Sequence, residues 1–107
     1  MTIVALAAMV PRALEAADRL YSEAGISAGV VDLRSLVPLD TKTIFEQVEK
    51  TSRLVTVEEN PRLCGWGAEI SSIVGEERFW DLDMPIIRIT TPHIPLPSAD
   101  ELEDLAI

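Results

Sequence analysis

The sequence has few of the residues from which metal and redox sites are built. Its 107 residues include one cysteine, Cys64, and one histidine, His93. An internal disulfide requires two thiols, and one Cys with one His cannot complete a zinc site. We therefore expect no metal site. The single thiol fits a reducing compartment, either the cytoplasm or, for a eukaryotic protein, the mitochondrial matrix.

Basic residues, aromatic residues and long apolar runs are also scarce. Nine Lys and Arg residues stand against 18 Asp and Glu residues, which gives a formal net charge of −9. Because nucleic acids bind basic surfaces, this charge argues against a nucleic-acid partner. It suits a basic protein partner or simply solubility. No apolar run reaches the roughly 20 residues that span a bilayer, so we expect no membrane partner.

Four apolar segments that read as strands alternate with three amphipathic segments that read as helices. Nearly continuous apolar character is typical of strands buried on both faces of a parallel sheet. The predicted strands are residues 2–7, 28–33, 54–57 and 86–90. We therefore predict that residues 1–107 form a single three-layer α/β/α domain. Its mostly parallel sheet has four strands in the order 2-1-3-4, with helices on both faces.

Local signals mark the ends and faces of the helices. Pro11 is tolerated where the first helix begins, and Gly25 is expected to end that helix. Asp40 is predicted to cap the second helix. Helical spacing of apolar residues predicts the inner faces. These are Leu14, Ala17, Leu20, Tyr21 and Ala24 in the first helix, and Ile44, Phe45 and Val48 in the second.

Residues 53–73 read as a strand, an acidic turn, a glycine-rich segment and a helix. The turn begins at Glu58 and Glu59, where the strand is predicted to end. Two carboxylates without a lysine make a poor anion site, so Gly65 and Gly67 resemble a dinucleotide-binding turn only weakly. Alternatively, these glycines let the helix start pack close to the sheet. One of the two glutamates is expected to cap that helix.

Two alternative sites follow from this arrangement. A small ligand could bind at the switch point of the sheet, where Met9 and its neighbours would face Glu58. Cys64 precedes a helix start, which would stabilise a thiolate, but its base would have to be the distant His93. Cys64 could equally be a small packing residue. Glu58 and Glu59 point opposite ways on an extended chain, which argues against an acid–base pair.

The segment after the third helix combines acidic and aromatic residues. Its members are Glu76, Glu77, Phe79, Trp80, Asp81, Leu82 and Asp83. Carboxylates beside aromatic rings are typical of a surface that binds a basic protein. Alternatively, the aromatic side chains belong to the core and the acids form a solvated rim.

The last residues differ in composition from the rest of the chain. Residues 91–97 contain three prolines and are expected to be extended. Ser98 and Glu101 have the spacing of a capping box. The chain then stops at apolar residues, so we expect it to be a truncated piece of a longer subunit.

Several segments carry a family resemblance. These are VDLRSLVPLDTKTIFEQVEKTSRLVTVEE, GAEI and FWDLDMPIIRIT, followed by the proline-rich segment and LED. Together they resemble the C-terminal domain of the beta subunit of 2-oxo acid dehydrogenases. These enzymes are the decarboxylating components of the pyruvate, branched-chain 2-oxo acid and acetoin dehydrogenase complexes. They belong to the wider transketolase C-terminal group. The resemblance covers residues 2–107, and residues 32–40 are its most specific motif.

The resemblance implies a role in a larger enzyme. The parent reaction would be oxidative decarboxylation of a 2-oxo acid, with acyl transfer to a lipoyl group. Thiamine diphosphate and magnesium would be held by other domains, so this domain alone would be inactive and bind no cofactor. It would help to pair the alpha subunit and a second beta subunit. It would also bind the basic subunit-binding domain of the dihydrolipoyl acyltransferase through Asp83, with Asp81 as its neighbour.

The resemblance leaves two further functions open. One is a regulatory module that binds a small ligand at the switch point. The other is the equivalent domain of another transketolase-like enzyme. The family also usually has an antiparallel edge strand before Thr2 and a terminal helix after Ile107, and this sequence contains neither.

Overall fold

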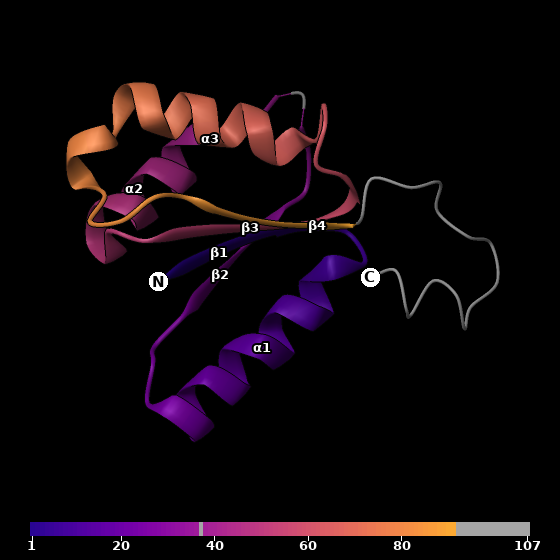
Figure 1. Cartoon of the computed structure of the whole chain (residues 1–107), viewed down its shortest axis with the longest axis vertical. Helices are drawn as coiled ribbons and strands as arrows, with labels where there is room; N and C mark the ends of the chain where they lie inside the picture. The colour runs from indigo at the N-terminus through magenta and orange to yellow at the C-terminus, as the bar shows by residue number, and fades with distance from the viewer. Residues whose placement is uncertain (37, 92–107) are drawn as a thin grey trace, which may run out of the picture.

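Four parallel strands form the centre of the structure, in the order β2-β1-β3-β4 (Figure 1). The computed structural model describes residues 1–36 and 38–91. The strands are β1 (Thr2–Leu6), β2 (Gly29–Leu33), β3 (Leu54–Pro61) and β4 (Ile87–Thr91). The predicted strand order is confirmed. The predicted bounds of β1, β2 and β4 agree with the structure to within one residue at each end.

Helices cover both faces of this sheet, so the predicted three-layer architecture is also confirmed. Helix α1 (Met9–Ala24) lies on one face, and α2 (Thr41–Thr51) and α3 (Trp66–Glu77) lie on the other (Figure 1). A short 3₁₀ helix, η1 (Phe79–Asp81), follows α3. Successive strand residues point to opposite faces and fill two aliphatic cores. Ile3, Ala5, Val55 and Val57 pack with Met9 and Ala13, whereas Val4, Leu33 and Leu54 pack with Ile44, Val48, Ile70 and Val74.

Both predicted helix caps are confirmed. Gly25 ends α1 with a left-handed φ of 68°, and its N–H donates to the Tyr21 carbonyl at 3.0 Å. Asp40 begins α2 and accepts hydrogen bonds from the hydroxyl of Thr43 at 2.6 Å and its backbone N–H at 3.2 Å. These two bonds to the Thr43 hydroxyl and N–H hold the pKa of Asp40 below its ordinary value.

The predicted inner face of α1 is partly wrong. Leu14 and Tyr21 are 52% and 70% exposed, whereas Met9 and Ala13 are buried against the sheet. The short side chain of Ala13 allows the helix to approach the strands closely. The apolar spacing predicted an amphipathic helix correctly, but the contacting stripe is rotated from the predicted one.

The predicted end of β3 is also wrong. The strand continues through Glu58 to Pro61 rather than ending at Val57. Its pairing with β4 is irregular there, because Val57 pairs with Ile89 while Pro61 pairs with Thr91. A charged residue can extend this strand because Glu58 has partners inside the fold.

Two further sequence predictions concern membrane-spanning segments and the residues after Thr91. Every helix within residues 1–36 and 38–91 is too short or too polar to span a bilayer. His93, the proline-rich segment after Thr91 and the predicted capping box at Ser98 and Glu101 lie outside the described residues.

Candidate functional site

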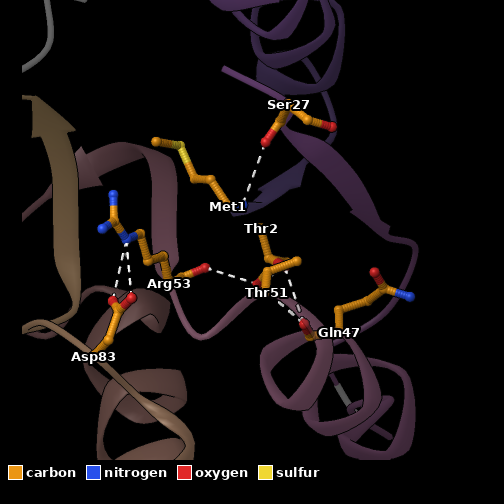
Figure 2. Close-up of polar contacts among 7 residues, drawn as sticks. All are labelled: Met1, Thr2, Ser27, Gln47, Thr51, Arg53 and Asp83. Atoms are coloured by element: carbon orange, nitrogen blue, oxygen red, sulfur yellow. Dashed lines mark hydrogen bonds and ion pairs between the residues drawn. The ribbon is translucent and has the colours of Figure 1, made fainter. Parts of the chain in front are cut away.

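Asp83 lies in the loop between η1 and β4, where it contacts Arg53 (Figure 2). The two carboxylate oxygens of Asp83 are 3.1 and 3.3 Å from Nε of Arg53. The backbone N–H of Asp83 donates to the Ser52 carbonyl at 2.9 Å. Both side chains of the pair are about half-exposed. The carboxylate is therefore held in place and still open to solvent.

Arg53 is itself positioned by a hydrogen-bonded network at the start of the sheet. Ser52 ends α2 with a left-handed φ of 60°, which turns the chain into β3. The Thr51 hydroxyl lies 2.7 Å from the Thr2 hydroxyl, 3.0 Å from the Gln47 carbonyl and 3.2 Å from the Arg53 carbonyl (Figure 2). The network joins the starts of β1 and β3 to the end of α2. The network therefore fixes the backbone of Arg53, whose side chain pairs with Asp83.

Asp81 also faces an arginine of the same chain. Its Oδ2 lies 3.8 Å from Nε of Arg78, and the two side chains are partly exposed. The Arg78 guanidinium in turn lies 4.9 Å from the centre of the Phe45 ring. Sequence reasoning singled out Asp81 and Asp83 but missed Arg53 and Arg78. Arg53 lies 30 residues from Asp83, so no local pattern pairs them.

We define the acidic–aromatic patch as Glu76, Glu77, Phe79, Trp80, Asp81 and Asp83. Trp80 is 92% exposed and Phe79 is 57% exposed. Their rings meet edge to face, with centroids 5.0 Å apart and planes at 78°. The alternative that both aromatic side chains belong to the core is therefore wrong. Leu82, between the acids, instead packs against the core formed by α2 and α3.

Within the sheet, Glu58 of β3 and Arg88 of β4 form a buried ion pair. Glu58 Oε1 lies 2.6 Å from an Arg88 guanidinium nitrogen, and its side chain has no exposed surface. The other oxygen accepts from the Gly67 N–H at 2.9 Å and from the Asn60 amide at 3.0 Å. Glu58 is therefore the glutamate that caps α3, as predicted for one of the two. Arg88 was missed, although a charge within an apolar strand indicates a buried partner.

Gly65 and Gly67 serve close packing rather than phosphate binding. A Cβ at Gly67 would lie 2.7 Å from Oε1 of Glu58 and 2.7 Å from Oγ1 of Thr56. The carboxylate of Glu58 occupies the start of α3, where a phosphate would have to bind. The predicted packing role of these glycines is confirmed, and the dinucleotide interpretation has no support in this geometry.

The other candidate residues are not brought together. Met9 packs on the α1 face of the sheet, whereas Glu58 bonds to α3 on the opposite face. Cys64 is exposed, with a left-handed φ of 59°, and it lines a groove of about 500 Å³ with Arg62 and Arg88. Its proposed base, His93, lies outside the described residues. Within the described part of the chain, no group of three His, Cys, Asp or Glu residues could hold a metal ion.

A family model and two related proteins match nearly the whole chain. The family model described as "Transketolase, C-terminal domain" matches residues 1–107. The chain is 50% identical over 107 residues to "Pyruvate dehydrogenase E1 component subunit beta-2, mitochondrial" of Oryza sativa subsp. japonica. It is 49% identical over 105 residues to "Acetoin:2,6-dichlorophenolindophenol oxidoreductase subunit beta" of Bacillus subtilis (strain 168). These matches cover 100% and 97% of this chain but 28% and 30% of the relatives.

A solved structure shares the fold. The chain matches the structure titled "Split gene transketolase, inactive beta4 tetramer" with a TM-score of 0.83 and 34% sequence identity. The match covers 98% of this chain and 33% of that one. The chain thus spans about a third or less of each of these relatives.

Proposed function

Because the chain belongs to the transketolase C-terminal domain family, we propose that it is an assembly domain of a 2-oxo acid dehydrogenase beta subunit. In this role it helps to pair the alpha subunit and a second beta subunit. It also binds the basic subunit-binding domain of the dihydrolipoyl acyltransferase. The names of the relatives, beta subunits of pyruvate dehydrogenase and of an acetoin oxidoreductase, support this placement.

The proposed domain is non-catalytic. The parent enzyme would decarboxylate a 2-oxo acid and pass the acyl group to a lipoyl arm, using thiamine diphosphate and magnesium. The start of α3 does not fit a diphosphate, because the carboxylate of Glu58 fills it and the chain is strongly acidic. We therefore assign both cofactors to other domains of the parent enzyme.

The single observation that carries the docking role is the exposure of the acidic–aromatic patch. Asp83 binds Arg53 through one nitrogen, Nε, and about half of its side chain stays exposed. A carboxylate has about four lone-pair sites, so it can accept a further cation without losing Arg53. Partner binding would then remove solvent from the pair and strengthen the new contact.

The test is to replace Asp83 with Asn in the assembled parent enzyme and to measure binding of the purified subunit-binding domain by calorimetry. We expect the affinity to fall by about tenfold to thirtyfold, since one charge contact at a half-exposed site is lost. The loss should be smaller at 300 mM than at 50 mM salt, because salt screens exposed charges. Decarboxylation with an artificial electron acceptor should be unchanged.

Asp18→Asn is the matched control, because Asp18 is an exposed carboxylate on α1, on the opposite face of the sheet. It should leave the affinity unchanged. Equal losses from Asp18→Asn and Asp83→Asn would show that net charge, not this surface, attracts the partner. Loss of decarboxylation together with binding would contradict a non-catalytic role.

A further inference from the structure

We propose that Trp80 is the anchor of this docking surface and that its indole receives a Lys or Arg side chain from the basic partner. The inference rests on the proposed function, because it names a contact within the same site. Trp80 is 92% exposed, the largest exposed fraction among the large apolar side chains of the described residues. Tryptophan is enriched among residues that dominate binding energy, and its ring is the best aromatic acceptor of a cation.

The indole is presented from a fixed turn. The N–H groups of Asp81 and Leu82 donate to the carbonyls of Arg78 and Phe79, at 3.0 and 3.2 Å, which closes η1. Leu82 anchors this turn by packing against the core formed by α2 and α3. The edge of Phe79 further limits the positions of the Trp80 ring. The backbone that carries Trp80 is therefore ordered before binding, which lowers the entropy lost when the partner binds.

The charges around the indole favour a cationic partner. Asp81 and Asp83 each face an arginine of the chain, whereas Glu76 and Glu77 are exposed and have no ion-pair partner among the described residues. Glu76 and Glu77 therefore add unpaired negative charge four and three residues before Trp80, and sequence reasoning placed them only in the general cluster.

The position of Glu76 and Glu77 is electrostatically unfavourable in the isolated chain. They occupy the last turn of α3, which contains no basic residue. The carboxyl end of a helix carries a partial negative charge, so carboxylates there are destabilising. Arg78 offsets this in part by donating to the Glu77 carbonyl at 3.0 Å. A partner cation would relieve the remaining repulsion. Removing these carboxylates should therefore stabilise the isolated chain and weaken its binding to the partner.

The anchor is tested by surface plasmon resonance on the assembled parent enzyme, with the purified subunit-binding domain as the analyte. Trp80→Ala should weaken binding at least about tenfold, mainly through faster dissociation. Trp80→Phe should lose less, because it keeps a ring. Tyr21→Ala, which removes an exposed ring from α1 on the other face, should have no effect.

The paired replacement Glu76→Gln with Glu77→Gln gives a second readout. We expect the thermal midpoint of the protein to rise while the affinity for the basic partner falls. Unchanged binding by Trp80→Ala, with Asp83→Asn still weakened, would overturn the anchor and leave the docking role intact. No binding by the unaltered enzyme would overturn the docking role and the anchor together.

Discussion

A carboxylate inside a parallel sheet is destabilising unless a cation and hydrogen-bond donors replace its water. Glu58 meets this requirement with three partners: Arg88, the N–H of Gly67 and the amide of Asn60. The same contacts join β3, β4 and the start of α3. This one residue therefore explains why β3 continues past its apolar segment.

Replacing Glu58 with Gln tests this explanation at the level of a residue. The amide keeps the size of the side chain but leaves the nearly buried Arg88 guanidinium without a counter-charge. Breaking a buried pair from one side costs about 3–5 kcal/mol, and we expect a loss of free energy of unfolding near the lower end. Urea unfolding measures it.

Glu59→Gln is the matched control for Glu58→Gln, because Glu59 is the next residue on β3 and is only partly buried. It should change the free energy of unfolding by less than about 0.5 kcal/mol. Similar losses from both variants would mean that the Glu58–Arg88 pair is not the source of the loss.

Residue-scale features were predictable from the sequence where their cause is local. Gly25 and Asp40 lie at helix ends that the neighbouring residues define, and both act as predicted. Arg53 and Arg88 bind acids 30 residues away, and that pairing depends on how the strands are ordered. Arg88 did leave a signal, a lone charge in an apolar strand, but that signal does not name the partner.

At the scale of elements, α3 approaches the sheet closely because Gly67 has no side chain. Thr56 on β3 is fully buried, and Glu58 is tied to both Arg88 and α3. Neither side chain can withdraw without breaking a contact or moving the strand. The close approach of α3 therefore depends on this glycine.

Gly67→Ala should lower the free energy of unfolding by about 1–3 kcal/mol, the usual range for an added methyl group in a packed site. Gly75→Ala is the control on the same helix, because a Cβ at Gly75 would have no atom within 4 Å. That change should raise the free energy of unfolding by about 0.5–1 kcal/mol, since alanine favours the helix. Thermal and urea unfolding of both variants would measure the difference, and destabilisation by both would refute the packing explanation.

The rotation of α1 shows what helical spacing leaves open. Leu14 and Tyr21 have the periodicity of a buried stripe, yet Met9 and Ala13 make the contacts with the sheet. A small residue lets the helix axis approach the strands, so it can be preferred over a larger apolar one at the contact. Spacing predicts amphipathicity, but the shape of the neighbouring surface selects the stripe.

At the scale of the whole molecule, strand order could be predicted because few topologies satisfy alternating strands and helices with short connections. The acidic–aromatic patch was predicted as a cluster, but its exposure depends on Leu82, and not Trp80, occupying the core. The internal partners of Asp81 and Asp83 depend on the folded arrangement of α2, β3 and η1. The sequence thus predicts where the acidic–aromatic patch lies along the chain, but not which of its carboxylates have an arginine partner.

The net charge of −9 acts on the whole molecule, and its effect competes with that of the exposed ion pairs. Exposed pairs such as Arg53 with Asp83 and Arg19 with Glu23 contribute about 0–1 kcal/mol each, and salt weakens them. Salt also screens the repulsion among the excess carboxylates, and we expect that effect to dominate. The thermal midpoint should therefore rise by about 4 °C between 10 and 200 mM NaCl, corresponding to roughly 1 kcal/mol.

Scanning calorimetry at the two salt concentrations measures this shift, and a charge-altered variant identifies its cause. Glu15 and Glu49 are exposed, on α1 and α2, and exchanging both for Lys makes the net charge less negative by four units. In that variant the rise of the midpoint with salt should be about half as large or smaller, since less repulsion remains to be screened. A midpoint that falls with salt in the unaltered protein would mean that the surface ion pairs outweigh the repulsion, and Arg53 with Asp83 would then contribute more to stability than its exposure implies.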